Sequence, residues 1–137
     1  MATRLTAAAK TATDPRESEK HAVAGMKAVF ALAALWKLDN EQLRVLLGQP
    51  SERTLYNWKA GKVALPSRDT MSRIGYLLGI HRALRTLFAN PENVYGWVSR
   101  SNEDFGGQSP LQRMLGGELT DLAHVRQYVD SLRGGWS

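Results

Sequence analysis

The side chains with the clearest chemical potential lie close together, between residues 51 and 62. They carry hydroxyl, carboxylate, guanidinium, amide and ammonium groups, and they are Ser51, Glu52, Arg53, Thr54, Asn57, Lys59 and Lys62. An arginine can donate two hydrogen bonds to guanine, an asparagine can pair with adenine, and a glutamate can accept a hydrogen bond from cytosine. Hydroxyl groups at the start of a helix can bind phosphate, because the helix N-terminus attracts anions. Lysines add electrostatic attraction to the phosphates that does not depend on base sequence. This pattern predicts a contact with double-stranded DNA.

Residues that would support catalysis or metal binding are scattered along the chain. The histidines His21, His81 and His124 lack the spacing of a metal site. His81 falls on an apolar helical stripe, where we expect a half-buried histidine with a hydrogen-bond partner. The chain has no cysteine, which removes disulfides, thiolate catalysis and cysteine-ligated metals. It also carries no phosphate-binding loop and no nucleophile motif. We therefore expect no enzyme, no cofactor and no metal.

The charge is unevenly distributed. Residues 1–38 hold 6 Lys/Arg and 3 Asp/Glu, a net of +3, and residues 39–89 hold 8 and 4, a net of +4. Residues 90–137 hold 4 and 6, a net of −2, which completes the total of +5. A basic segment binds phosphate by releasing counterions, although a solvated basic surface explains the same count. The first two thirds are therefore the candidate for DNA contact.

The sequence predicts a cytoplasmic protein. No segment reaches the roughly 18 apolar residues of a membrane span. The first 15 residues lack the apolar stretch of a signal peptide. The absence of cysteine fits a reducing cytosol.

Apolar residues recur every three or four positions, which predicts an all-α fold without strands. The expected helices cover residues 18–38, 40–47, 51–60, 67–88, 93–99, 110–115 and 120–132. Residues 1–17 read as a flexible tail, 18–89 as the first domain and 90–137 as a second, smaller helical domain. The broad apolar face of residues 18–38 indicates a central helix or a dimer contact.

Residues 39–61 have the pattern of a helix-turn-helix unit. Leu43, Leu46 and Leu47 would support Leu55 and Trp58 of the second helix, whose other face is polar. The turn falls at residues 48–50, where glycine tolerates a left-handed conformation and proline cannot continue a helix. A helical hairpin buried in a bundle would share this pattern, so the residues alone leave both interpretations open.

Two segments resemble a known family. Residues 51–61 (SERTLYNWKAG) resemble the recognition helix of Xre-type regulators. Residues 87–94 (LFANPENV) and 107–115 (GQSPLQRML) resemble the toxin-binding domain of the Xre/MbcA/ParS antitoxin family. The likeness covers roughly residues 20–137. It implies a type II antitoxin that neutralises a RES-domain toxin, which acts on NAD, and represses its own operon.

The C-terminus is the expected toxin contact. Gly135 precedes Trp136 and Ser137, so a large aromatic side chain ends the sequence on a flexible glycine hinge. The resemblance implies that this end lies at the toxin active site. Arg126 and Arg133 on the last helix would meet acidic groups of the toxin. The alternatives are that Trp136 folds back on its own domain and that the two arginines are a solvated face.

Two other functions stay open. A phage-repressor-like transcription regulator would bind DNA without an obligate partner, and a protein-interaction module would use the helix-turn-helix only as structure. For the leading interpretation we expect a homodimer inside a larger toxin–antitoxin complex, because operators usually present paired half-sites.

Overall fold

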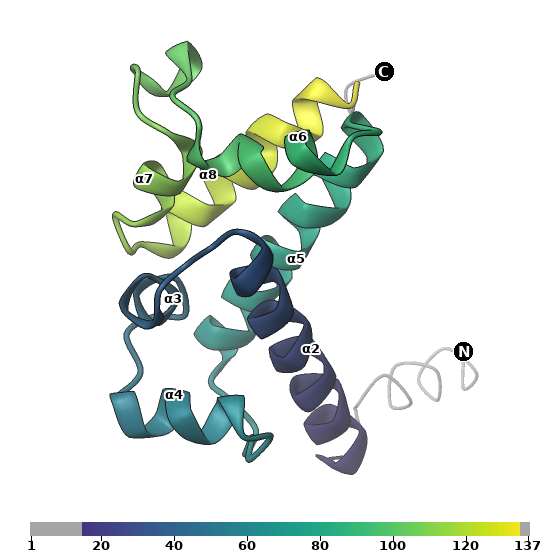
Figure 1. Cartoon of the computed structure of the whole chain (residues 1–137). Coiled ribbons are helices and arrows are strands. Elements are labelled where there is room, and N and C mark those ends of the chain that lie inside the picture. Colours follow the sequence, from purple (N-terminus) through teal and green to yellow (C-terminus); the bar gives the residue numbers. More distant parts are fainter. Residues whose placement is uncertain (1–14, 135–137) are drawn as a thin grey trace, which may run out of the picture.

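The computed structural model describes residues 15–134, and all regular structure in that range is helical. The elements are α2 (Pro15–Leu35), α3 (Asn40–Leu46), α4 (Glu52–Lys59), α5 (Arg68–Leu87), α6 (Pro91–Gly96), η1 (Trp97–Ser99), η2 (Glu103–Phe105), α7 (Pro110–Met114) and α8 (Leu119–Leu132). Figure 1 shows α4 and α8 at opposite ends of the molecule, with α5 running between them. The predicted all-α fold is confirmed.

Helix α2 begins and ends three residues earlier than the sequence predicts. Its end is set by Lys37, whose backbone φ of 60° is left-handed. The N–H of Lys37 donates to the carbonyl of Ala34, and that of Leu38 donates to Ala33, which together close the helix terminus. One face of α2 is buried in the core, through Ala22, Met26, Val29, Leu32 and Ala33, and Trp36 directly after the helix is buried as well. The broad apolar face predicted for residues 18–38 thus contributes to the core, and a dimer contact of this segment stays a prediction.

Most helices start at a short polar side chain, as the sequence predicts. Asp39 caps α3, with its carboxylate 2.7 Å from the Gln42 nitrogen and the Gln42 side chain bonded back to the Asp39 N–H. Ser109 caps α7 in the same reciprocal way with Gln112. Asn90 caps α6, which begins at Pro91 and ends at Gly96, earlier than the helix predicted over residues 93–99.

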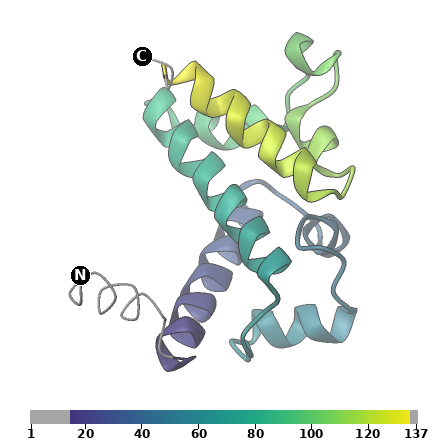
Figure 2. The same cartoon turned by 180° about the vertical axis from the view of Figure 1, so that it is seen from behind.

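Helix α5 supports both ends of the molecule (Figure 2). It packs most extensively against α8 and next against α2. Two glycines bring these helices close. A Cβ on Gly25 of α2 would stand 3.2 Å from Ile74 Cγ2, and a Cβ on Gly79 would stand 1.8 Å from a guanidinium nitrogen of Arg126 on α8. The absence of a side chain at these two positions therefore leaves room for Ile74 against α2 and for the Arg126 guanidinium against α5.

The buried face of α5 is wider than the sequence predicts, and it is rotated. The spacing of apolar residues in this segment predicts a stripe of Met71, Ile74, Leu78, His81, Leu84 and Phe88, of which only Ile74 and Leu84 are fully buried. Leu77, Ile80 and Ala83 are buried as well. The reason is that α2 and α8 cover α5 from two sides, so no single stripe describes its burial. Within residues 15–134, no helix is long and apolar enough to cross a membrane.

The half-buried histidine expected at position 81 is confirmed. Its Nε2 lies 3.3 Å from the hydroxyl oxygen of Tyr95 on α6, and the two rings are 5.5 Å apart. Burial, followed by the charge of Arg85, lowers the pKa of His81 below its usual value of 6.5. His81 is therefore neutral in the folded protein at neutral pH.

This histidine predicts a pH dependence of stability. As the pH falls below 6.5, the unfolded chain takes up a proton that folded His81 resists, so the free energy of unfolding decreases. In His81→Gln, an uncharged side chain of similar reach, that part of the decrease is expected to vanish. Urea unfolding at about pH 7.5 and about pH 5.5 measures it. Equal losses in wild type and variant would contradict the assignment.

Candidate nucleic-acid and partner interfaces

The turn between α3 and α4 is built from two left-handed residues. Gly48 has a φ of 93° and Gln49 a φ of 62°, which confirms the predicted break. Arg44 holds the turn from α3: its Nη1 donates to the Pro50 carbonyl at 3.1 Å, while its Nε and Nη2 donate to the Glu41 carboxylate. These bonds lower the pKa of Glu41 and raise the pKa of Arg44. The leucines expected beneath the unit are all buried, namely Leu43, Leu46, Leu47 and Leu55.

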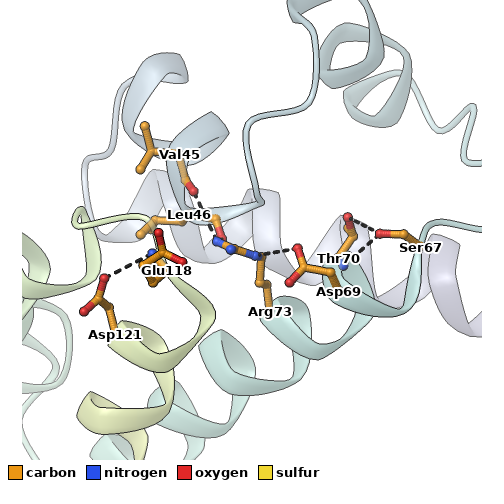
Figure 3. Close-up of polar contacts among 8 residues, drawn as sticks. All are labelled: Val45, Leu46, Ser67, Asp69, Thr70, Arg73, Glu118 and Asp121. Carbon is orange, nitrogen blue, oxygen red and sulfur yellow. Dashed lines mark hydrogen bonds and ion pairs between the residues drawn. The ribbon is translucent and has the colours of Figure 1, made fainter.

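A second arginine, Arg73, binds the end of α3 directly before the same turn (Figure 3). Arg73 on α5 is 6% exposed, and its Nε lies 2.8 Å from the Asp69 carboxylate. Its Nη1 donates to the carbonyl oxygens of Leu46 and Val45, at 3.3 and 3.5 Å. Because the last carbonyls of a helix have no partner within it, Arg73 satisfies the end of α3. The sequence analysis did not single out Arg73.

Helix α4 presents most of the predicted DNA-contacting side chains to solvent. Ser51 is its N-cap, accepting from the Thr54 N–H and donating to the Thr54 hydroxyl at 2.9 Å. Both hydroxyls are therefore partly engaged in capping. The half-buried members of the predicted set are Thr54 and Asn57, and the exposed members are Ser51, Glu52, Arg53, Lys59 and Lys62.

The most exposed large hydrophobic side chain of the described residues lies on α4 and is not among the predicted DNA contacts. Tyr56, in the middle of α4, is 73% exposed. Its position follows from helical spacing: Leu55 and Trp58 face inward, so Tyr56 points outward between Arg53 and Lys59. The three side chains border a groove of about 740 Å³ between α3 and α4, whose remaining lining is Phe30, Asn40, Glu41, Arg44, Glu52 and Leu55. An exposed aromatic ring flanked by two cations suits a nucleic-acid surface.

The two arginines predicted to bind a toxin differ in their surroundings. Arg126 covers Gly79 and pairs with Asp130 at 2.9 Å, so its guanidinium already has partners within the molecule. Arg133, at the end of α8, is exposed. Gly135, Trp136 and Ser137 lie outside the described residues.

The described histidines lie on separate helices, with His21 on α2, His81 on α5 and His124 on α8. Among residues 15–134, no group of three acidic or histidine side chains is placed to hold a metal ion.

The fold and the exposed face of α4 together define a helix-turn-helix protein with an attached helical domain. Residues 21–79 match the antitoxin Xre-like helix-turn-helix domain, and residues 83–135 match the antitoxin Xre/MbcA/ParS C-terminal toxin-binding domain. An uncharacterized protein of Sinorhizobium fredii, y4oB, is 37% identical over 123 residues, covering 90% of this chain and 95% of that protein. The chain belongs to the Xre/MbcA/ParS antitoxin family.

The two family matches meet within α5, between residues 79 and 83. Helix α5 thus starts in the helix-turn-helix match and ends in the toxin-binding match. The domain limits predicted from the sequence (1–17, 18–89 and 90–137) stay a prediction.

Proposed function

We propose that this antitoxin neutralises a RES-domain toxin by capping its active site and represses its own operon through α4. It acts in the cytoplasm as a homodimer within a larger complex with the toxin. Its DNA-contacting side chains are the seven predicted between residues 51 and 62, with Tyr56 added. Its toxin contacts include Arg133 and the C-terminal residues 135–137. Arg126 can contact the toxin only if its ion pair with Asp130 breaks, or if an acidic side chain of the toxin binds to its guanidinium beside Asp130.

One observation carries this proposal. The polar, cationic face of α4 and the toxin-binding domain lie at opposite ends of α5, so one chain can hold DNA and a toxin at once (Figure 1). A stand-alone regulator would have no use for the second domain. A pure interaction module would have no use for the exposed Arg53, Tyr56 and Lys59 on a helix whose preceding turn is held by hydrogen bonds.

The two activities should be separable by mutation. Arg53→Ala and Asn57→Ala are each expected to weaken operator binding by about 2 kcal/mol and to leave toxin neutralisation intact. Deletion of residues 135–137 is expected to do the reverse. The measurements are operator affinity in a gel-shift titration and NAD consumption by the product of the neighbouring gene.

Arg82→Ala is the matched control for the DNA variants, because Arg82 is an exposed arginine on α5, away from α4. It removes the same charge, so any excess loss in Arg53→Ala reports the position and not the net charge. If no neighbouring product is silenced, the stand-alone regulator replaces the antitoxin proposal. If the toxin is silenced but no DNA is bound, the helix-turn-helix is structural.

A further inference from the structure

One edge of α8 carries side chains that the core leaves uncovered. His124, Tyr128 and Leu132 recur every four residues and so lie along one line of the helix. His124 is exposed, Tyr128 is half-buried, and Leu132 is 47% exposed. The adjoining side of α8, with Leu122, Val125 and Val129, is buried.

Two aromatic residues from the preceding segments extend this edge. Trp97 of η1 stacks on Tyr128 with ring centres 6.0 Å apart, and Phe105 of η2 meets the rings of Tyr128 and His124 edge-on at 5.0 and 5.7 Å. The Tyr128 hydroxyl donates to the Asp104 carboxylate at 2.5 Å, which raises the pKa of Tyr128. Phe105 is itself buried, at 8% exposed, so it supports the other rings from within the domain. We call Trp97, Phe105, His124, Tyr128 and Leu132 the α8 face.

The ring contacts and the hydrogen bond of Tyr128 restrain the aromatic side chains of the α8 face. Aromatic anchors held in place lose little conformational entropy on binding, and tryptophan and tyrosine are enriched among residues that dominate interface energies. A preformed aromatic surface is therefore better suited to docking than a set of free side chains would be.

Two other parts of this domain pack against the helix-turn-helix half and α5. Arg126 and Gly79 join α8 to α5. The Gly117 turn lies against Val45 of α3, where a Cβ on Gly117 would be 3.6 Å from Val45 Cγ1. In the sequence, Leu132 stands three residues before Gly135, the first of the C-terminal residues proposed above as toxin contacts. All five residues of the face also fall within the toxin-binding match, residues 83–135.

We infer that the toxin docks on the α8 face, an inference that rests on the proposed function. The toxin surface that fits it is apolar at its centre, to receive Leu132 and the rings, and basic at its edge. The basic edge is required because Glu103 and Asp104 are exposed beside Phe105. Docking here engages α8 and leaves α4 free.

The test compares toxin affinity among charge substitutions at exposed positions of the full chain. Leu132→Glu, which puts a charge at the apolar centre, and His124→Lys, which puts a cation beside the basic edge of the toxin, are each expected to raise the dissociation constant for the purified toxin by at least about tenfold. Leu132→Met should bind as wild type does, because it keeps an apolar side chain of similar size. The matched control is Leu65→Glu, since Leu65 is 56% exposed in the helix-turn-helix half and should change affinity by less than about twofold.

Circular dichroism and operator binding show whether each variant is folded. Because positions 132 and 124 are tested independently, the test remains valid if one of the two variants misfolds. If wild type binds the toxin and both α8 variants bind equally well, the α8 face is wrong while the antitoxin function stands. If Leu65→Glu weakens binding as much as Leu132→Glu, the effect is one of net charge and the inference also falls. If wild type captures no toxin, the proposed function fails, and the α8 face with it.

Discussion

Replacing Arg73 with methionine is expected to lower the free energy of unfolding by about 3 kcal/mol. Methionine has a similar length but no donors, so the carbonyl at the end of α3 that Arg73 reaches at 3.3 Å, that of Leu46, loses this hydrogen bond. The ion pair with Asp69 is also lost, although Asp69 is half exposed and returns to water at small cost. The buried end of α3 therefore accounts for most of the effect. Urea unfolding followed by circular dichroism measures it.

The effect of Arg73→Met should extend to DNA binding, because the end of α3 sets the turn that leads into α4. Operator affinity is expected to fall by about tenfold at a temperature where the variant is fully folded. Asp69→Asn is the matched control: it removes the ion pair but leaves the bonds from Arg73 to α3, and should cost about 1 kcal/mol or less. If Arg73→Met lowers the free energy of unfolding by less than about 1 kcal/mol, the hydrogen bonds from Arg73 to the end of α3 are dispensable.

The elements of this fold could be predicted from the sequence because their ends carry local signals. Asp39, Ser51, Ser67 and Ser109 each cap a helix at the expected place, and the glycine turns lie where the sequence puts them. Such signals act within four residues of the chain, so they need no knowledge of tertiary packing. The main local error is at Lys37, where a non-glycine residue adopts a left-handed conformation and ends α2 early.

The tertiary contacts could not be predicted in the same way. Arg73 looks like any surface arginine in the sequence, and its burial depends on α3, 27 residues earlier in the chain. Leu77 lies outside the predicted stripe because a single stripe assumes that one helix packs against α5. In the structure both α2 and α8 pack against it. Tyr56 could have been found, since its outward position follows from Leu55 and Trp58. The aromatic contacts of the α8 face join three segments and left no periodic signal.

Leu77→Ala is expected to lower the free energy of unfolding by about 3–4 kcal/mol. Leu77 is 1% exposed and lies one helical turn after Arg73 on α5. It borders a small internal space too narrow for water, together with side chains of α2 and α3 that include Trp36, Leu43 and Leu46. Truncation enlarges this space, and its walls cannot collapse easily because three helices with a closely packed backbone form them. The cost is therefore that of the lost apolar contacts and of a new cavity.

Two further variants separate these causes. Leu77→Met keeps the volume and should cost less than about 1.5 kcal/mol. Leu78→Ala removes the same atoms from a half-buried position next in the chain and should cost about 1 kcal/mol. If Leu77→Ala and Leu78→Ala lower the free energy of unfolding equally, the packing of α5 does not support α3. The support of the turn between α3 and α4 must then come from Arg44 and the apolar face of α2. If the large difference is found, α5 supports that turn twice, through the guanidinium of Arg73 and through the packing of Leu77.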